Sequence, residues 1–97
     1  MQHTIEVVIF PAKPGVTPAQ LVAASAAITP ILAAMPGFIS RDFGFGDDGQ
    51  FLDIIHWRDR AAADFAAQHV MADTLCCAYF ELMDQTRMQF NYFNHVF

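Results

Sequence analysis

FISRDFGF (Phe38–Phe45) and FLDIIHW (Phe51–Trp57), joined by GDDG (Gly46–Gly49), are the segments that decide the fold of this chain. Both are rich in aromatic and β-branched residues, a composition that favours β-strands. The glycines and aspartates between them are typical of a tight turn between antiparallel strands. The sequence therefore predicts a β-hairpin near the middle of the chain.

A helix is predicted on the N-terminal side of this hairpin. Thr17 is a suitable N-cap, Pro18 fits the first helical position, and Gln20 is placed to complete a capping box. Apolar residues then recur at helical spacing until Pro36 and Gly37, which are typical of a helix end. Pro30 lies inside this run, so we expect a kink or a break there, near Thr29.

A second helix is predicted after the hairpin, with Asp59 as its N-cap. Its apolar face is expected to hold Ala62, Phe65, Ala66 and His69. The helical pattern resumes after Asp73, so we expect this helix to be bent or split near Ala72.

Two further strands complete the pattern, one at each end of the chain. HTIEVVIF (His3–Phe10) is rich in β-branched residues and ends at a proline, and Arg87–Phe97 alternates large apolar with polar residues. The order βαββαβ predicts an α+β fold of the ferredoxin-like kind, with a four-stranded antiparallel sheet. We expect the strands to lie in the order four, one, three, two, within a single domain spanning residues 1–97.

The composition restricts the partners of this domain. Of the 97 residues, 55% are hydrophobic and only 15% are charged, which indicates more apolar surface than one small core can cover. We therefore expect a homodimer. The net charge of -5 and the absence of a basic cluster argue against nucleic acid and anionic membranes as partners.

Several other classes of protein are also disfavoured. Arg41–Phe45 superficially resembles an RNA-binding signature, but it lies on the wrong strand of an acidic chain. No run of about twenty apolar residues is present, and the N-terminal residues do not resemble a secretory signal, so we expect a cytoplasmic protein. Cys76 and Cys77 are adjacent and are interpreted as small apolar residues, with a redox role as the alternative.

Met35-Pro36-Gly37-Phe38 before the hairpin and the W-x-x-x-A-A stretch at Trp57–Ala62 are the most informative short motifs. Together with the order of elements, they resemble the antibiotic biosynthesis monooxygenase family of the dimeric α+β barrel superfamily. The resemblance implies a homodimer whose sheets face one another, with an apolar cavity between each sheet and its helices. Some members oxidise phenolic or quinol-type substrates without a metal or flavin, so no cofactor is predicted.

A different branch of this family degrades haem, using an asparagine on the first strand. Ile5–Phe10 contains no asparagine, so haem breakdown is not expected here. Asp53 and His56 are three residues apart on one predicted strand and should point to opposite faces of the sheet. No metal site is predicted, because no other ligand spacing typical of a metal centre is present.

Three residues are the candidates for catalysis. The resemblance places Trp57 at a strand end, where its indole N–H could donate a hydrogen bond to a substrate oxygen. His69 could act as the base that takes a phenolic proton, and Tyr79 could orient the substrate. Phe65, Phe80 and His56 are the candidate substrate contacts. Ordinary packing explains Trp57, Tyr79, Phe65 and Phe80 as well. The alternative for His69 is a histidine that is satisfied by other contacts or exposed at the rim.

The leading hypothesis is a cofactor-independent monooxygenase-like protein that acts on a small aromatic or quinol-type molecule in an apolar pocket. The first alternative is a dimeric module that binds a small molecule without reacting. The second is a structural dimer whose cavity is filled by Phe65, Phe80 and Phe90. The sequence does not identify the substrate, the pathway or any assembly beyond the dimer.

Overall fold

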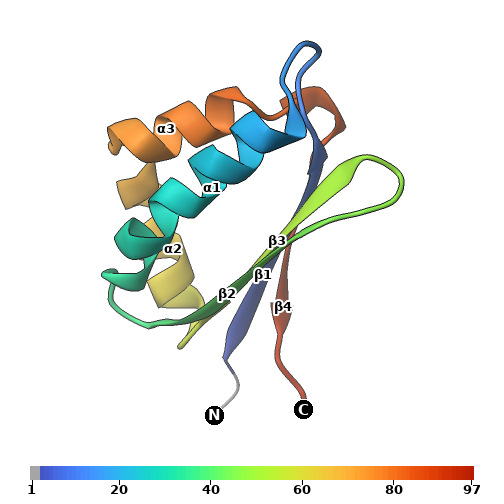
Figure 1. The fold of residues 1–97 in the computed structure, drawn as a ribbon. Helices are drawn as coiled ribbons and strands as arrows, with labels where there is room; N and C mark the ends of the chain where they lie inside the picture. Colours follow the sequence, from blue (N-terminus) through green and yellow to red (C-terminus); the bar gives the residue numbers. More distant parts are fainter. Residues whose placement is uncertain (1–2) are drawn as a thin grey trace.

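The computed structural model describes residues 3–97; Met1 and Gln2, which belong to the N-terminal segment that does not resemble a secretory signal, lie outside this range. It contains one sheet and three α-helices (Figure 1). In chain order the elements are β1 (Thr4–Pro11), α1 (Pro18–Ala33), β2 (Phe38–Phe45), β3 (Gln50–Trp57), α2 (Arg60–Val70), α3 (Thr74–Glu81), the 3₁₀ turn η1 (Gln85–Arg87) and β4 (Gln89–Asn94). The predicted α+β, ferredoxin-like order is confirmed.

The four strands pair in the order β2-β3-β1-β4, and every pairing is antiparallel. This is the predicted order, described from the other edge. The central hairpin is also confirmed: Gly46 N–H donates to the Gln50 carbonyl at 2.8 Å, and Gly49 adopts a positive φ of 82°. The first and last strands therefore lie side by side although they are farthest apart in the sequence.

The helices pack on one face of the sheet and leave the other face without a helical layer (Figure 1). Alternation along the strands sorts the side chains between these faces. In β3, Phe51, Asp53, Ile55 and Trp57 are buried towards the helices, and the residues between them point the other way. The main core therefore lies between the sheet and the helices.

Capping residues fix where the helices begin. The Thr17 hydroxyl accepts from the Gln20 N–H at 3.2 Å, and the Gln20 side chain accepts from the Thr17 N–H at 2.8 Å, so the capping box is confirmed. Asp73 caps α3 by accepting from the Cys76 N–H, which confirms the split between α2 and α3. The break expected at Pro30 is absent, because α1 continues to Ala33.

The last strand is shorter than expected. Arg87 belongs to the 3₁₀ turn, whose start is capped by the Asp84 side chain, and the strand ends at Asn94.

Cys76 is buried and burial raises the pKa of its thiol to about 12, which agrees with the interpretation as an apolar residue. Among residues 3–97, no helix combines the length and hydrophobicity needed to cross a lipid bilayer.

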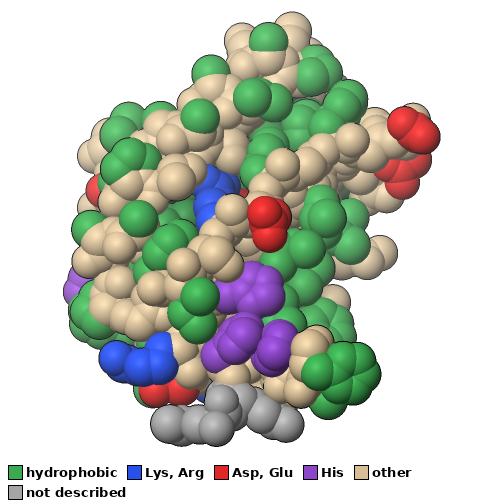
Figure 2. Space-filling view, turned by 60° about the horizontal axis from the view of Figure 1, so that its bottom comes forward, with side chains coloured by type: hydrophobic (Ala, Val, Ile, Leu, Met, Phe, Trp, Pro, Cys, Tyr) green, Lys and Arg blue, Asp and Glu red, His purple; other side chains and the backbone are tan. Residues whose placement is uncertain are grey.

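The helix-free face of the sheet, called the open face below, is mainly apolar. It carries Ile5, Val7, Ile9, Leu52, Ile54 and Phe93, as the strand registers place them. Three histidines, His3, His56 and His95, gather at one end of the sheet, with hydrophobic side chains beside them (Figure 2). The Phe93 side chain is 52% exposed, so the open face presents apolar surface to solvent.

Candidate functional site

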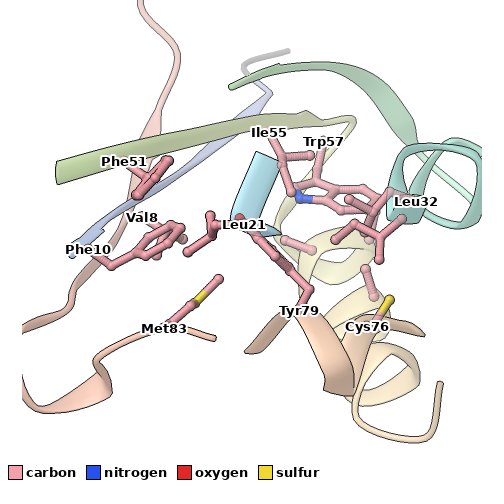
Figure 3. Close-up of a cluster of buried hydrophobic side chains, with 14 residues drawn as sticks. Val8, Phe10, Leu21, Leu32, Phe51, Ile55, Trp57, Cys76, Tyr79 and Met83 are labelled. Carbon is pink, nitrogen blue, oxygen red and sulfur yellow. The ribbon is translucent and has the colours of Figure 1, made fainter. Parts of the chain in front are cut away.

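A cavity of about 270 Å³ lies between the sheet and the helices. Its wall is mostly apolar, and its volume is close to the lower end of the range for small-molecule sites. Figure 3 shows two of its aromatic residues, Trp57 from β3 and Tyr79 from α3, in the layer between sheet and helices. The cavity is lined by Glu6, Val8, Ile28, Leu32, Asp53, Ile55, Trp57, Ala66, Ala67, Val70, Met71, Tyr79, Phe80, Met83, Gln85, Met88 and Phe90.

Trp57 lies at the end of β3, as expected, and its side chain is buried. Its indole N–H donates to Oε1 of Glu6 at 3.2 Å. The two residues come from neighbouring strands, because Glu6 of β1 pairs with Ile55, two positions before Trp57. The predicted hydrogen-bond donor is therefore already engaged by a carboxyl group that also lines the cavity.

Glu6 is the residue that sequence analysis missed. Burial raises the pKa of its carboxyl group to about 7, because the apolar surroundings disfavour the charged form. The hydrogen bond from Trp57 acts in the opposite direction, by stabilising the carboxylate. A carboxyl group with a pKa near neutrality can gain or lose a proton at physiological pH, which suits general acid–base chemistry.

A buried ion pair borders the cavity. Arg41 and Asp53 make two parallel hydrogen bonds, and the remaining Arg41 donors reach the Ser25 carbonyl, the Ser25 hydroxyl and the Thr29 hydroxyl at 2.8 to 2.9 Å. All five guanidinium N–H groups are thereby used. These hydrogen bonds join β2 and β3 to α1, and they use every N–H group of the Arg41 side chain.

Tyr79 is fixed by the same ion pair. Its hydroxyl donates to Oδ2 of Asp53 at 2.8 Å, and burial together with the negative charge of Asp53 raises its pKa. The phenol therefore stays protonated at physiological pH. Its ring stands in the cavity wall, and the orienting role remains a prediction that this position supports.

His69 and Phe65 lie outside the cavity, contrary to expectation. His69 is exposed, its ring stacks on Phe65 with centroids 3.8 Å apart, and its Nδ1 is 2.9 Å from the Phe65 carbonyl oxygen. The buried stripe of α2 consists of Ala62, Ala63 and Ala66, with Val70 half-buried. At 100° per residue, Phe65 and His69 lie beyond the edge of this stripe, on the solvent side. His69 is therefore not retained as a base of the cavity.

His56 is also separated from the cavity. It alternates with the buried residues of β3 and so projects from the open face, where its Nδ1 is 2.7 Å from Nε2 of His3. Phe80, by contrast, lines the cavity as predicted, and Phe90 does the same without filling it. Trp57, Tyr79 and Phe80 are thus the expected site residues that the structure brings together.

The part of the chain that the structure describes has no cluster of three or more histidine, cysteine, aspartate or glutamate side chains placed to hold a metal ion. Asp53 and His56 point to opposite faces of β3, as predicted, and Asp53 is held by Arg41 and Tyr79. The polar chemistry of the cavity therefore rests on Glu6, Trp57 and Tyr79.

The fold is that of the antibiotic biosynthesis monooxygenase-like proteins, so the resemblance noted from the sequence is confirmed at the level of the fold. SnoaB, a cofactor-independent oxygenase from Streptomyces nogalater, is 18% identical, with a TM-score of 0.79 over 100% of this chain and 96% of SnoaB. A candidate antibiotic biosynthesis monooxygenase from Nitrosomonas europaea is 15% identical, with a TM-score of 0.74 over 98% and 91% of the two chains.

Protein SO0527 from Shewanella oneidensis is 25% identical, with a TM-score of 0.73 over 97% of this chain and 91% of that protein. The sequence itself matches no protein-family model and no curated protein. At these identities the likeness establishes the fold alone, so the function has to be argued from the site.

Proposed function

We propose that this protein is a homodimeric, cofactor-independent monooxygenase that acts on a small aromatic or quinol-type substrate. The observation that carries the proposal is the apolar cavity of about 270 Å³ in which Trp57, Tyr79 and Phe80 meet. Such a cavity suits a flat, mostly apolar molecule with one or two polar substituents. SnoaB, which shares the fold, is a cofactor-independent oxygenase, and this supports the same class of reaction.

The reaction needs an electron-rich substrate. Loss of a proton from such a molecule leaves an anion that can reduce O₂ directly. One oxygen atom enters the substrate as a carbonyl group and the other leaves as water, so the substrate itself supplies the electrons. The protein has to bind the ring, accept the proton and keep bulk water away from the reacting anion.

The open face supports the homodimer. Its central strands present a continuous apolar surface that includes Val7, Leu52 and Ile54, flanked by polar groups such as Asp42 and Asn91 on the edge strands. A second copy has the same surface and can cover it in a two-fold arrangement. The homodimer, the single domain and the cytoplasmic location stay predictions.

The test is oxygen consumption in the presence of a panel of hydroquinones and naphthohydroquinones, corrected for spontaneous oxidation. Trp57→Phe removes the indole N–H from the cavity and should lower the rate at least about tenfold, the size of one lost catalytic hydrogen bond. His69→Ala is the matched control, because His69 is exposed and lies outside the cavity. Unchanged consumption in Trp57→Phe would refute the role of Trp57, and no consumption by the wild type with any member of the panel would refute the oxygenase proposal.

A non-catalytic small-molecule binder is the second candidate. It is favoured by one observation: the Trp57 N–H and the Tyr79 O–H both donate to carboxyl groups of the protein rather than pointing freely into the cavity. A binder would take up aromatic molecules without consuming oxygen. Equilibrium binding measured beside oxygen consumption therefore separates the two candidates.

A further inference from the structure

Glu6 differs from every other acidic residue that lines the cavity or carries an ion pair. Asp53, the other acid in the cavity wall, accepts two hydrogen bonds from Arg41 and one from Tyr79. Glu6 accepts one hydrogen bond, from the neutral indole of Trp57. Among residues 3–97 no other group donates to its carboxyl group, so Oε2 is available to a bound molecule.

None of the positively charged side chains forms an ion pair with Glu6. Each of the five basic side chains pairs with a carboxylate other than Glu6. These pairs are Lys13–Glu81, Arg41–Asp53, Arg58–Asp59, Arg60–Asp64 and Arg87–Asp84. A negative charge on Glu6 is therefore not neutralised by a contacting cation, and it faces a mostly apolar cavity. A carboxylate in such a place favours any ligand that brings it a hydrogen-bond donor.

We propose that Glu6 is the proton acceptor of this cavity, and that the cavity selects small aromatic molecules bearing an ionisable hydroxyl group, such as phenols, naphthols and hydroquinones. The catalytic part of this inference rests on the proposed oxygenase function. The binding part does not, because it depends only on the cavity and on the carboxyl group in its wall.

The proton transfer follows from the hydrogen bonds on either side of Glu6. The ligand hydroxyl donates to the Glu6 carboxylate; its O–H bond breaks, the proton moves to the carboxylate, and the electron pair stays on the ligand oxygen. The neutral carboxylic acid is a weaker acceptor, so the Trp57 N–H becomes free to donate to the new phenolate. The Trp57 N–H would thus donate a hydrogen bond to Glu6 before the proton transfer and to the ligand anion after it.

The other titratable groups near Glu6 are less suited to this step. Tyr92 stands opposite Glu6 on β4, and burial together with the charge of Glu6 raises its pKa, so its phenol stays protonated. The Tyr79 hydroxyl is a donor to Asp53, and Asp53 is held by Arg41. The pKa of Glu6, raised by burial to about 7, makes its carboxylate a stronger base than an ordinary glutamate while still leaving it partly ionised at neutral pH. The position of Glu6 in the cavity wall and the basicity of its carboxylate therefore both identify Glu6 as the proton acceptor.

The experiment compares the binding of 1-naphthol and naphthalene between pH 5.5 and pH 8, where the naphthol itself stays almost fully protonated, by fluorescence titration. The wild-type affinity for 1-naphthol should rise about tenfold across this range as Glu6 ionises, which corresponds to one charge-assisted hydrogen bond. Glu6→Gln should abolish this rise, whereas Glu81→Gln, an exposed control on α3, should preserve it. Naphthalene should bind wild type and Glu6→Gln equally, which shows that the cavity of the variant is intact.

The outcomes separate this inference from the proposed function. Naphthol binding that is independent of pH, or that keeps its pH dependence in Glu6→Gln, overturns the role of Glu6 and leaves the cavity in place. Oxygen consumption by Glu6→Gln at the wild-type rate overturns the proton transfer but keeps the oxygenase. Naphthol binding that depends on Glu6, with no oxygen consumption for any hydroquinone, supports the binding site and overturns the oxygenase. Failure of both probes to bind overturns the site as a whole.

Discussion

Arg41 and Asp53 form a bidentate ion pair in the interior of the protein, with Nε to Oδ1 at 2.9 Å and Nη2 to Oδ2 at 2.8 Å. Their side chains are only 3% and 6% exposed. Ser25 of α1 and Tyr79 of α3 complete the hydrogen bonds around the pair. Two strands and two helices are therefore joined through one buried network beside the cavity.

Asp53→Asn should destabilise the protein by about 3–5 kcal/mol, because it leaves the Arg41 cation buried without its counter-charge. Urea denaturation measures the loss, and Asp47→Asn in the exposed hairpin turn is the control. The double variant Arg41→Met with Asp53→Leu should recover most of the stability, since it removes both charges together. If the free energy of unfolding of Asp53→Asn lies within about 1 kcal/mol of the wild-type value, the ion pair contributes little to the stability.

The buried network shows which features of the structure could be predicted from the sequence and which could not. The element order, the hairpin, the caps at Thr17 and Asp59, the split of the second helix near Ala72 and the strand order were predicted from the sequence. Asp53 lies on the same face of β3 as Phe51, Ile55 and Trp57, so the alternation that set it opposite His56 also accounts for its burial, which was not predicted. Its partner could not be deduced, because Arg41 reaches it only through the register between β2 and β3.

The wrong predictions at the candidate site also arose because local sequence patterns do not show how the elements pack together. Ala62 and Ala66 of the predicted apolar face of α2 are buried, as expected, but Phe65 and His69 lie beyond the edge of this face. The buried stripe is made mainly of alanines, whose periodic signal is too weak to show where it ends. Glu6 was overlooked because it stands between β-branched residues in a strand whose two faces are both largely apolar. Only the pairing of β1 with β3 places it next to Trp57.

Glu6 should make the stability of the wild type fall as the pH rises. The ordinary pKa of 4.5 applies to the unfolded chain and the raised pKa of about 7 to the native state, so the native state holds more protons between these values. Stability is therefore fully present below about pH 4.5 and declines towards pH 7, by up to about 3 kcal/mol. Urea denaturation at a series of pH values should show this decline in wild type and in Glu81→Gln, but not in Glu6→Gln. A parallel profile for Glu6→Gln would mean that another group is responsible.

Gly37 should not tolerate a side chain. It has a φ of +82°, and an added Cβ would stand 2.5 Å from the Cβ of Ala62 in α2. Gly15 has a similar φ of +86° but open space around it, so Gly15→Ala reports the conformational cost alone, about 1–2 kcal/mol. Gly37→Ala should cost clearly more than Gly15→Ala in thermal or urea denaturation. Equal losses would indicate that α2 shifts to relieve the clash at no cost.

His3 should make the fold sensitive to acid. Partial desolvation lowers its pKa, and the neighbouring His95 and His56 lower it further. A lowered pKa means that the unfolded chain binds the proton more readily, so stability is lost as the pH falls below the ordinary value of 6.5. Protonation also removes the acceptor needed if His3 receives the hydrogen bond that joins it to His56. This contribution opposes that of Glu6 in the same pH range, so only the difference between variant and wild type isolates it. The stability of His3→Gln relative to wild type should rise between pH 7 and pH 5, and a difference that does not change with pH would rule His3 out.

Ile54 lies in β3 on the open face, opposite Val7 of β1, and provides the strictest test of the homodimer. If a second copy covers this face, Ile54→Lys places an ammonium group in an apolar interface, where desolvation costs several kcal/mol without a partner. Sedimentation velocity at micromolar concentration should then show a dimer for wild type and a monomer for Ile54→Lys.

Val22→Lys is the matched control for this change. Val22 is an exposed apolar residue on α1, 46% accessible, on the helical side of the molecule. The same change of side chain at this position should leave the dimer intact, because the helices do not contribute to the proposed interface. A wild-type monomer, or a dimer that persists in Ile54→Lys but dissociates in Val22→Lys, would contradict pairing through the open face and would assign the association to the helical layer.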